Sequence, residues 1–347
     1  MKNVFIDTVK DGDVFDSIFL IDDISERATK KNKSYWILTL KDKTGSLQGK
    51  VWDNECWCGT AVPGRGEYVK VRVEVSSYKG KLDLNVKKIR RIEETEPGFD
   101  YADFVPVGPH NRFSMIAELE LWATHSIKHP GLRAVVESLF TDPKYFAAIR
   151  DCPAASNMHQ AYIGGLAEHI RNMLKISKHL GDQYELPQDS VDLLYAACFL
   201  HDIGKIEELK WTKAIGYTTE GQLIGHIGLG FEILERLRRV YWDGLGINPE
   251  GPSEPLDPDE GKEYDWGNMI WAHLRHLLAS HHGQLEWRAV ALPQSREAHL
   301  FHLIDMIDSR MGVFDRLDKN DVDEDGFTQF ENRLGTRAWR PNHEDRN

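Results

Sequence analysis

The chain has 347 residues, 41% hydrophobic and 28% charged, and a formal net charge of −12, which is typical of a soluble globular protein of two or three domains. The longest apolar stretch, residues 193–200, is too short to span a bilayer, the N-terminus lacks an apolar signal segment, and the four cysteines form no paired zinc motif. We therefore expect a cytoplasmic protein with reduced thiols and no membrane partner.

The first 93 residues are predicted to form short β-strands. Residues 34–40 alternate between polar and apolar side chains, Asp42–Gly45 is a turn, and residues 46–52 alternate again. A further alternating strand at residues 68–75 is followed by a turn at Tyr78–Lys81 and by another strand. About five short strands with turns of this kind predict an OB-fold β-barrel, which we assign to residues 1–93.

This first domain is also the basic part of the chain. It carries 18 basic and 14 acidic side chains, a net charge of +4, whereas the remainder carries −16. Positive charge attracts phosphate backbones and aromatic rings stack on bases, so we expect this domain to bind a single strand of RNA or DNA. Alternation also places some aromatics, such as Trp36 or Trp52, in the barrel core. The candidate contacts are Lys31, Lys33, Tyr35, Trp36, Lys50, Trp52, Tyr78, Lys79 and Lys81.

The chain then changes from strand to helix periodicity. Residues 94–113 contain three prolines and two glycines and are predicted to be a linker. From Ser114 to about residue 320 the apolar residues recur with helical spacing, which predicts an all-α domain, and residues 321–347 are a C-terminal tail. The expected helices include residues 163–180, 190–200, 224–240, 266–282 and 296–311. The predicted fold class is therefore α+β and multidomain, with the β-barrel first.

Histidines and carboxylates accompany the apolar helical segments of the second domain. His201 and Asp202 end one helix, and His169 follows the small pair Gly164-Gly165 on another. Asp305 lies in an apolar helix, where an unpaired carboxylate is costly. Neighbouring residues on a helix point about 100° apart, so His201 and Asp202 can reach a centre of two ions from two directions, and the carboxylate of Asp202 could bridge both. Imidazole and carboxylate ligands suit transition metals such as Mn, Fe, Ni or Zn.

A second ion needs further ligands, and His226, His281 and His282 are the candidates. Histidines at helix ends also act as caps or phosphate donors, and an isolated His-Asp pair is common in ordinary helices. The conjunction of all seven residues is what favours a metal centre. Two ions that share a hydroxide and polarise a phosphate hydrolyse phosphoesters, so we expect a phosphohydrolase.

At these residues the sequence resembles the HD-domain phosphohydrolases, whose hallmark is H…HD…D. The segment His159–His169 is similar to the H-x-A-x-x-G-G-L-x-E-H pattern of the YhaM family of 3′-to-5′ exoribonucleases, and so is Leu277–Gly283. That family also joins an N-terminal OB domain to an HD domain, here residues 114–320, so the resemblance covers nearly the whole chain. The sequence departs from the family after Glu286, where Trp287–Pro293 stands in place of a Gly-Ser-Pro-like turn.

The resemblance implies metal-dependent removal of nucleoside 5′-monophosphates from the 3′ end of single-stranded RNA, with single-stranded DNA as a further substrate. One ion would be held by His169, His201, Asp202 and Asp305, and the other by His226, His281, His282 and Asp202. Mn is the expected metal, and Fe, Ni, Co or Mg are alternatives. Asp202, Lys205 and His159 are the catalytic candidates, because Lys205 or His159 would offset charge on the phosphate. An exposed lysine at a helix end is the alternative interpretation of Lys205.

Two other functions fit the same residues. An HD-type phosphohydrolase of free or cyclic nucleotides would use the metal centre but would have no evident need for an OB domain. A non-catalytic nucleic-acid-binding protein would need only the OB domain, and would be expected to have lost one or more metal ligands. The native metal, the preference between RNA and DNA, and the oligomeric state are left open by the sequence.

Overall fold

The structure is a computed structural model that describes residues 2–29, 33–59, 62–78, 81–156, 160–247, 266–315, 322–331 and 334–340. The chain folds into two compact units. The first contains residues 1–107 together with Trp211–Ile215, and the second contains residues 108–210 and 216–347. The predicted domain boundaries at residues 93, 113 and 320 stay predictions. No helix among the described residues is long and apolar enough to cross a membrane.

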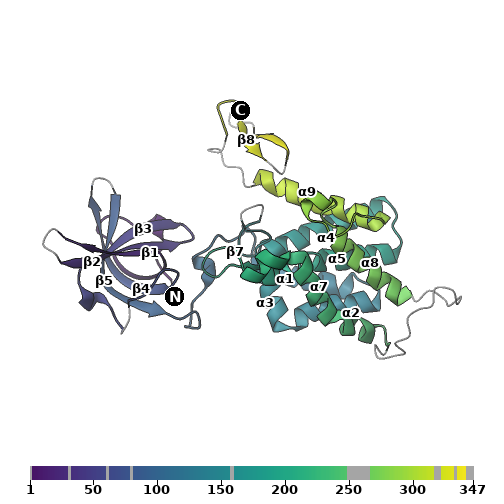
Figure 1. Ribbon diagram of the computed structural model, residues 1–347, viewed down its shortest axis with the longest axis horizontal. Helices are drawn as coiled ribbons and strands as arrows, with labels where there is room; N and C mark the ends of the chain where they lie inside the picture. Colours follow the sequence, from purple (N-terminus) through teal and green to yellow (C-terminus); the bar gives the residue numbers. More distant parts are fainter. Residues whose placement is uncertain are drawn as a thin grey trace. The chain divides into compact units, whose positions relative to one another are not determined.

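The first unit is a closed five-stranded barrel with the strand order β1-β2-β3-β5-β4 (Figure 1). All neighbouring strands are antiparallel except β3 and β5, which are parallel. The predicted OB-fold barrel is therefore confirmed. The strands are β1 (Val14–Ala28), β2 (Ser34–Asp42), β3 (Gly45–Val51), β4 (Tyr68–Tyr78) and β5 (Lys81–Ile92), and three 3₁₀ turns accompany them, η1 (Ile6–Thr8), η2 (Asn54–Cys56) and η3 (Tyr101–Asp103).

Alternation along the strands decides which side chains fill the barrel. In β4 the valines at positions 69, 71, 73 and 75 are buried, whereas the residues between them are not. Successive side chains of a strand point to opposite faces, so a single register places all four valines inside. Burying each valine stabilises the barrel by roughly 1.5 kcal/mol or more. The basic side chains of the same strands are left on the outside, where a ligand can reach them.

The second unit is helical, with two short β-hairpins. The helices are α1 (Arg112–His125), α2 (Pro130–Thr141), α3 (Pro143–Asp151), α4 (Gly165–Gln183), α5 (Gln188–Leu200), α6 (Lys205–Glu208), α7 (Thr219–Gly244), α8 (Trp266–Ser280) and α9 (Arg296–Asp315). The hairpins pair β6 (Leu209–Lys210) with β7 (Gly216–Tyr217) and β8 (Phe327–Glu331) with β9 (Thr336–Trp339). The predicted helical domain is confirmed, but the periodicity of the sequence predicted no strands in it or in the tail.

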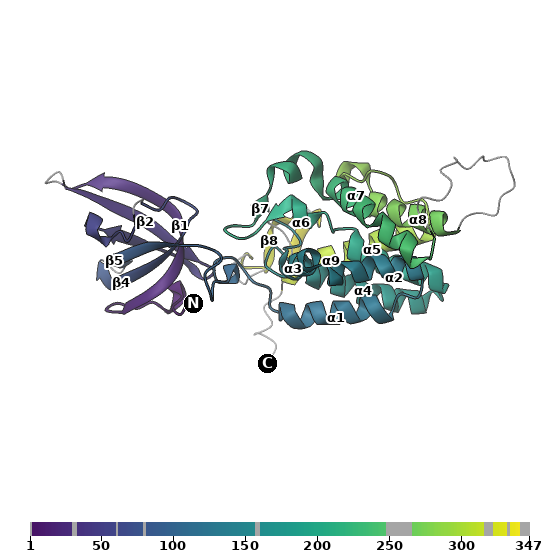
Figure 2. The same cartoon turned by 90° about the horizontal axis from the view of Figure 1, so that it is seen from below.

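Helix α5 is the centre of this unit. It contacts α2, α4, α8 and α9, and these helices surround it in both views (Figures 1 and 2). Every residue from Asp192 to Leu200 is buried, which is the pattern of a helix enclosed on all sides. The end of α5 is therefore held in the interior, and the His-Asp pair that follows it begins from a fixed point.

Candidate metal centre

The His-Asp pair lies in a tight bend between α5 and α6. His201 caps the end of α5, Asp202 follows it, and Gly204 precedes α6. A Cβ atom on Gly204 would lie 1.9 Å from the backbone oxygen of His226, so α6 and α7 approach at a distance that only glycine allows. This close crossing brings His226 to the same place as Asp202.

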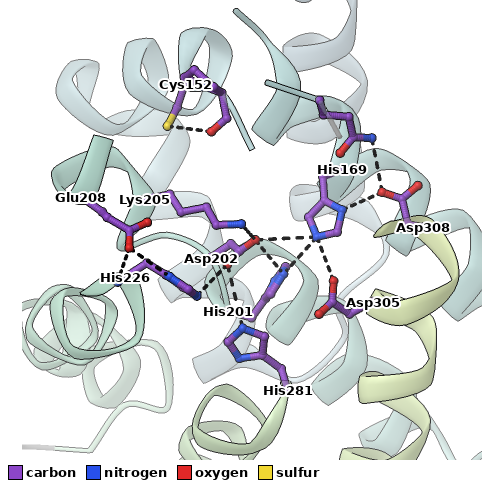
Figure 3. A network of polar contacts seen from close by, with 12 residues as sticks. Cys152, His169, His201, Asp202, Lys205, Glu208, His226, His281, Asp305 and Asp308 are labelled. Atoms are coloured by element: carbon purple, nitrogen blue, oxygen red, sulfur yellow. Dashed lines mark hydrogen bonds and ion pairs between the residues drawn. The ribbon is translucent and has the colours of Figure 1, made fainter. Parts of the chain in front are cut away.

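The first cluster of candidate ligands surrounds one point in the interior (Figure 3). His169 Nε2 lies 3.2 Å from His201 Nε2 and 3.4 Å from Asp305 Oδ1, and His201 Nε2 lies 3.2 Å from Asp202 Oδ2. An ion bound about 2.1 Å from each atom would place neighbouring ligands about 3.0–3.5 Å apart. His169, His201 and Asp202 thus have the spacing of a coordination shell, and Asp305 lies next to His169 at the same spacing.

The second cluster contains His226, His281 and His282, whose ligand atoms all lie within 4.8 Å of one another. Asp202 joins it through its other carboxylate oxygen: Oδ1 lies 3.4 Å from His226 Nε2 and 4.0 Å from His281 Nε2, whereas Oδ2 faces the first cluster. One carboxylate therefore points an oxygen at each group of imidazoles, which is the arrangement of a bridging ligand.

Two imidazole nitrogens of the second cluster have the properties expected of metal ligands. His226 Nε2 and His282 Nδ1 are buried and make no hydrogen bond within the described part of the chain. A buried polar atom without a partner is costly and rare in native proteins. An imidazole nitrogen that keeps its lone pair is a metal donor, so a bound ion satisfies both atoms. The residues present fit a divalent ion.

Hydrogen bonds fix the orientation of the imidazoles. His201 Nδ1 lies 3.2 Å from the Ala197 carbonyl, and His281 Nδ1 lies 2.7 Å from the Leu278 carbonyl. A ring nitrogen that donates to a carbonyl carries the proton, and this leaves Nε2 unprotonated and directed at the ion. These contacts lie within the helices themselves, so the helical backbone sets the tautomer of both ligands.

Two carboxylates fix the orientation of the His169 and His226 imidazoles, and neither carboxylate was predicted from the sequence. Asp308 Oδ2 lies 2.6 Å from His169 Nδ1, and Glu208 Oε1 lies 3.3 Å from His226 Nδ1. Asp308 had a signal in the sequence, because it follows Asp305 by one helical turn and so shares its face of α9. Glu208 had none, because its approach depends on the crossing of α6 and α7.

Burial and the neighbouring charges shift the pKa values of several candidate ligands. Burial raises the pKa of a carboxyl, but Lys205 and His201 outweigh it and hold the pKa of Asp202 well below its usual range. Burial and the neighbouring imidazoles lower the pKa of His281 and of His282. For His169, the hydrogen bonds and charges of Asp305 and Asp308 outweigh burial and raise its pKa to about 10.

Of the further catalytic candidates, Lys205 lies beside the metal-ligand candidates, whereas the structure does not describe His159. Lys205 is largely buried, and its Nζ lies 2.5 Å from Asp202 Oδ2 rather than in open solvent. It lines a cavity of about 390 Å³ whose floor is formed by the metal-ligand candidates. His159 lies outside the described residues. The cavity is lined by His169, Asp202, Lys205, His281, His282, Trp287, Asp305, Met306, Ser309 and Arg310.

The candidate nucleic-acid contacts on the barrel fall into different environments. Tyr35 and Trp52 stack on each other with ring centroids 4.7 Å apart, and Trp52 is 45% exposed. Trp36 instead packs against the barrel core, as expected for one of the aromatics.

The candidate lysines of the barrel also differ in their surroundings. Lys33 and Lys81 are exposed, and Lys50 is ion-paired with Asp83. Lys31, Lys79 and the side chain of Tyr78 lie outside the described part of the barrel.

Comparison with known proteins places both domains. A model of the HD domain matches residues 166–310, and a model of the OB-fold nucleic acid binding domain matches residues 21–92. A protein of Oceanobacillus iheyensis named 3′-5′ exoribonuclease YhaM is 32% identical over 337 residues, which cover 96% of this chain and 96% of that protein. The chain belongs to the YhaM family. The YhaM proteins of Bacillus subtilis and Listeria monocytogenes are each 30% identical, over 88% and 89% of this chain and the same shares of their own lengths.

Membership of the YhaM family confirms the resemblance seen in the sequence motifs. The match to the HD domain contains all seven predicted metal ligands and both carboxylates that orient them. An HD domain is a metal-dependent phosphohydrolase and binds divalent metal, and an OB-fold domain of this kind binds nucleic acid. The family therefore accounts for both halves of the chain, a metal centre and a surface for nucleic acid.

Proposed function

We propose that this protein is a metal-dependent 3′-to-5′ exonuclease that hydrolyses single-stranded RNA, and also single-stranded DNA, to nucleoside 5′-monophosphates. The observation that carries the proposal is the carboxylate of Asp202, whose two oxygens face two separate groups of imidazoles. Its relatives named 3′-5′ exoribonuclease, aligned along nearly the whole chain, support the same reaction.

In the proposed centre, one divalent ion is held by His169, His201, Asp202 and Asp305, and the other by His226, His281, His282 and Asp202. Bound ions polarise the phosphate and lower the pKa of a water molecule. Mn is the metal we propose, with Fe, Ni, Co or Mg as alternatives. The four cysteines are free, in keeping with an enzyme that works in the cytoplasm.

The protein groups bind and orient the phosphate. Water attacks the phosphorus of the last phosphodiester, the bond from phosphorus to the 3′ oxygen of the preceding nucleotide breaks, and that oxygen takes up a proton. The released product keeps the 5′-phosphate. The ammonium of Lys205 is buried beside Asp202 at the cavity wall, so it is placed to offset the negative charge that grows on the phosphate. His159 is proposed for the same task.

The cavity supports action at a strand end. At about 390 Å³ it lies near the lower limit of small-molecule pockets, which fits a terminal nucleotide better than a continuous strand. The barrel is proposed to hold the rest of the strand, through bases stacked on the Tyr35–Trp52 pair, of which Trp52 is exposed, and phosphates near Lys33, Lys50 and Lys81. Lys31, Tyr78 and Lys79 complete the proposed surface, whereas Trp36 packs against the barrel core.

The test is incubation of the full chain with Mn²⁺ and three substrates: 5′-labelled RNA, 5′-labelled DNA and a cyclic dinucleotide. We expect RNA to shorten one nucleotide at a time, with nucleoside 5′-monophosphate as product, and Asp202→Ala to lose at least a hundred-fold in rate. Asp243→Ala is the matched control, because that carboxylate is 61% exposed on α7. Hydrolysis of the cyclic dinucleotide alone would support the alternative phosphohydrolase, and an Asp202→Ala variant with full activity would refute the proposed centre.

A further inference from the structure

A tryptophan stands at the wall of the cavity above the metal centre. Trp287 lines the cavity together with the candidate ligands, and 44% of its surface is exposed. The other lining residues are mostly imidazoles, carboxylates and cations, so a large flat apolar ring is chemically out of place among them. Leaving an indole in contact with water has a cost that an aromatic ligand would remove.

The backbone holds Trp287 in one place. It ends the 3₁₀ turn η4 (Leu285–Trp287), in which the Trp287 and Ala289 amides both donate to the Gln284 carbonyl at 3.1 Å. Val290 N then donates to the Ala279 carbonyl at 2.8 Å, which ties the turn to the end of α8. The turn is thus fixed to α8, the helix that His281 and His282 directly follow.

The turn is also strained at one position. Arg288 has a φ of +69°, a left-handed conformation that non-glycine residues seldom adopt. Strained residues persist where the surrounding structure holds them, and they concentrate at functional sites. Arg288 directly follows Trp287, so its left-handed backbone conformation turns the chain immediately after the tryptophan.

A second contact supports the indole from the protein side. A Cβ atom on Gly283 would lie 2.2 Å from the ring of His302, so the chain passes directly over that imidazole. His302 Nδ1 donates to the His281 carbonyl at 2.7 Å, and its ring lies 6.2 Å from that of Trp287. The same imidazole therefore links the backbone of a metal-ligand candidate to the tryptophan, and the indole is positioned relative to the metal centre.

Another part of the cavity lining suits an anionic ligand. Met306, Ser309 and Arg310 line the cavity from α9. Arg310 is exposed, and no hydrogen bond or ion pair joins its guanidinium to another described residue. A cation and a metal centre that suit a phosphate, and an aromatic face that suits a base, line one small cavity and together match a nucleotide.

We propose that Trp287 forms a base-binding subsite, on which the base of the 3′-terminal nucleotide stacks while its 5′-phosphate lies at the metal centre. This rests on the proposed exonuclease function and adds the group that holds the departing nucleotide. Every base has a flat π-face, so the subsite accepts all four bases. A base that is paired in a duplex must first leave its partner, which costs a few kcal/mol, so the subsite favours an unpaired end.

The test compares a ligand that has a base with one that lacks it. The Mn²⁺-loaded full chain is titrated calorimetrically with adenosine 5′-monophosphate and with ribose 5-phosphate. We expect the nucleotide to bind about 5- to 100-fold more tightly, the range for stacking one base. Trp287→Leu keeps an apolar side chain without an aromatic face and should abolish the difference, whereas Trp287→Phe should retain most of it.

Leu285→Ala is the matched control, because Leu285 is 56% exposed on the same turn and does not line the cavity. It should leave the ratio of the two dissociation constants unchanged, and a thermal melt identifies any variant that fails to fold. If Trp287→Leu is folded and keeps the full ratio, or if wild type binds both ligands equally, the subsite is refuted. If wild type shortens no RNA but the ratio depends on Trp287, the exonuclease proposal fails and the subsite stands.

Discussion

Removing the negative charge at Asp308 should weaken one metal site and leave the other unchanged. The carboxylate is 7% exposed; its Oδ2 lies 2.6 Å from His169 Nδ1, and its Oδ1 accepts a hydrogen bond from Asn172 Nδ2 at 2.8 Å. Outer partners of metal-bound histidines are worth about 10- to 100-fold in metal affinity, or about 1.4–2.7 kcal/mol. Asp308→Asn keeps the shape and one acceptor but loses the charge, so we expect a loss near the lower end of this range.

Asp308→Ala also removes the acceptor, so its loss should be near the upper end. The assay is calorimetric titration of metal-free protein with Mn²⁺, in which the two sites are fitted as separate steps. Only the step that involves His169 should change, because Asp308 does not contact the second cluster. Asp243→Asn, on the exposed surface of α7, is the control for a change of charge. If both Asp308 variants are folded and bind both ions within about three-fold of wild type, the positioning role is wrong.

Three other predictions concern the fold and the metal. Gly204→Ala places a methyl group 1.9 Å from the His226 backbone oxygen, so it should separate α6 from α7 and abolish binding at the second site in the same titration. Stripping the ions with a chelator should lower the melting temperature, and restoring Mn²⁺ should recover it; an unchanged melt would contradict the metal assignment. In the first unit, hydrogen bonds from Arg90 lower the pKa of Glu96 to about 2. The stability that this pair contributes is therefore present above about pH 4.5 and lost as the pH falls toward 2. Arg90→Ala should return the pKa of Glu96, measured by NMR, toward 4.5.

Local pattern in the sequence was enough to predict the barrel and most of the helices. In β4 the alternation of valine with charged residues specifies both strand and register, because a slip by one residue would expose all four valines. The same rule could not separate Trp36 from Trp52. Trp36 lies within β2 and packs against the core, whereas Trp52 lies just beyond the end of β3, stacks on Tyr35 and stays 45% exposed.

The candidate ligands were identified by residue type, whereas the groups that orient them needed the fold. His201 and His281 are oriented by carbonyls of their own helices, which any helical histidine can reach, so nothing in the sequence marks these contacts. The expected helix at residues 224–240 in fact begins at Thr219 and breaks at Gly225, whose φ of +79° changes its direction one residue before His226. The placement of that ligand, and of Glu208 beside it, follows from the break and from the close approach at Gly204.

Metal binding and stability should be linked in this centre. Asp305 and Asp308 raise the pKa of His169 to about 10, Lys205 and His201 hold the pKa of Asp202 well below its usual range, and His226 Nε2 and His282 Nδ1 make no hydrogen bond among the described residues. Each orphaned nitrogen costs about 1–3 kcal/mol. Divalent ions would remove these costs together, because they satisfy the nitrogens and neutralise the carboxylates without a proton. The free energy of metal binding is then partly free energy of folding, and the most buried helix of the domain, α5, ends beside the residue that both ions would share.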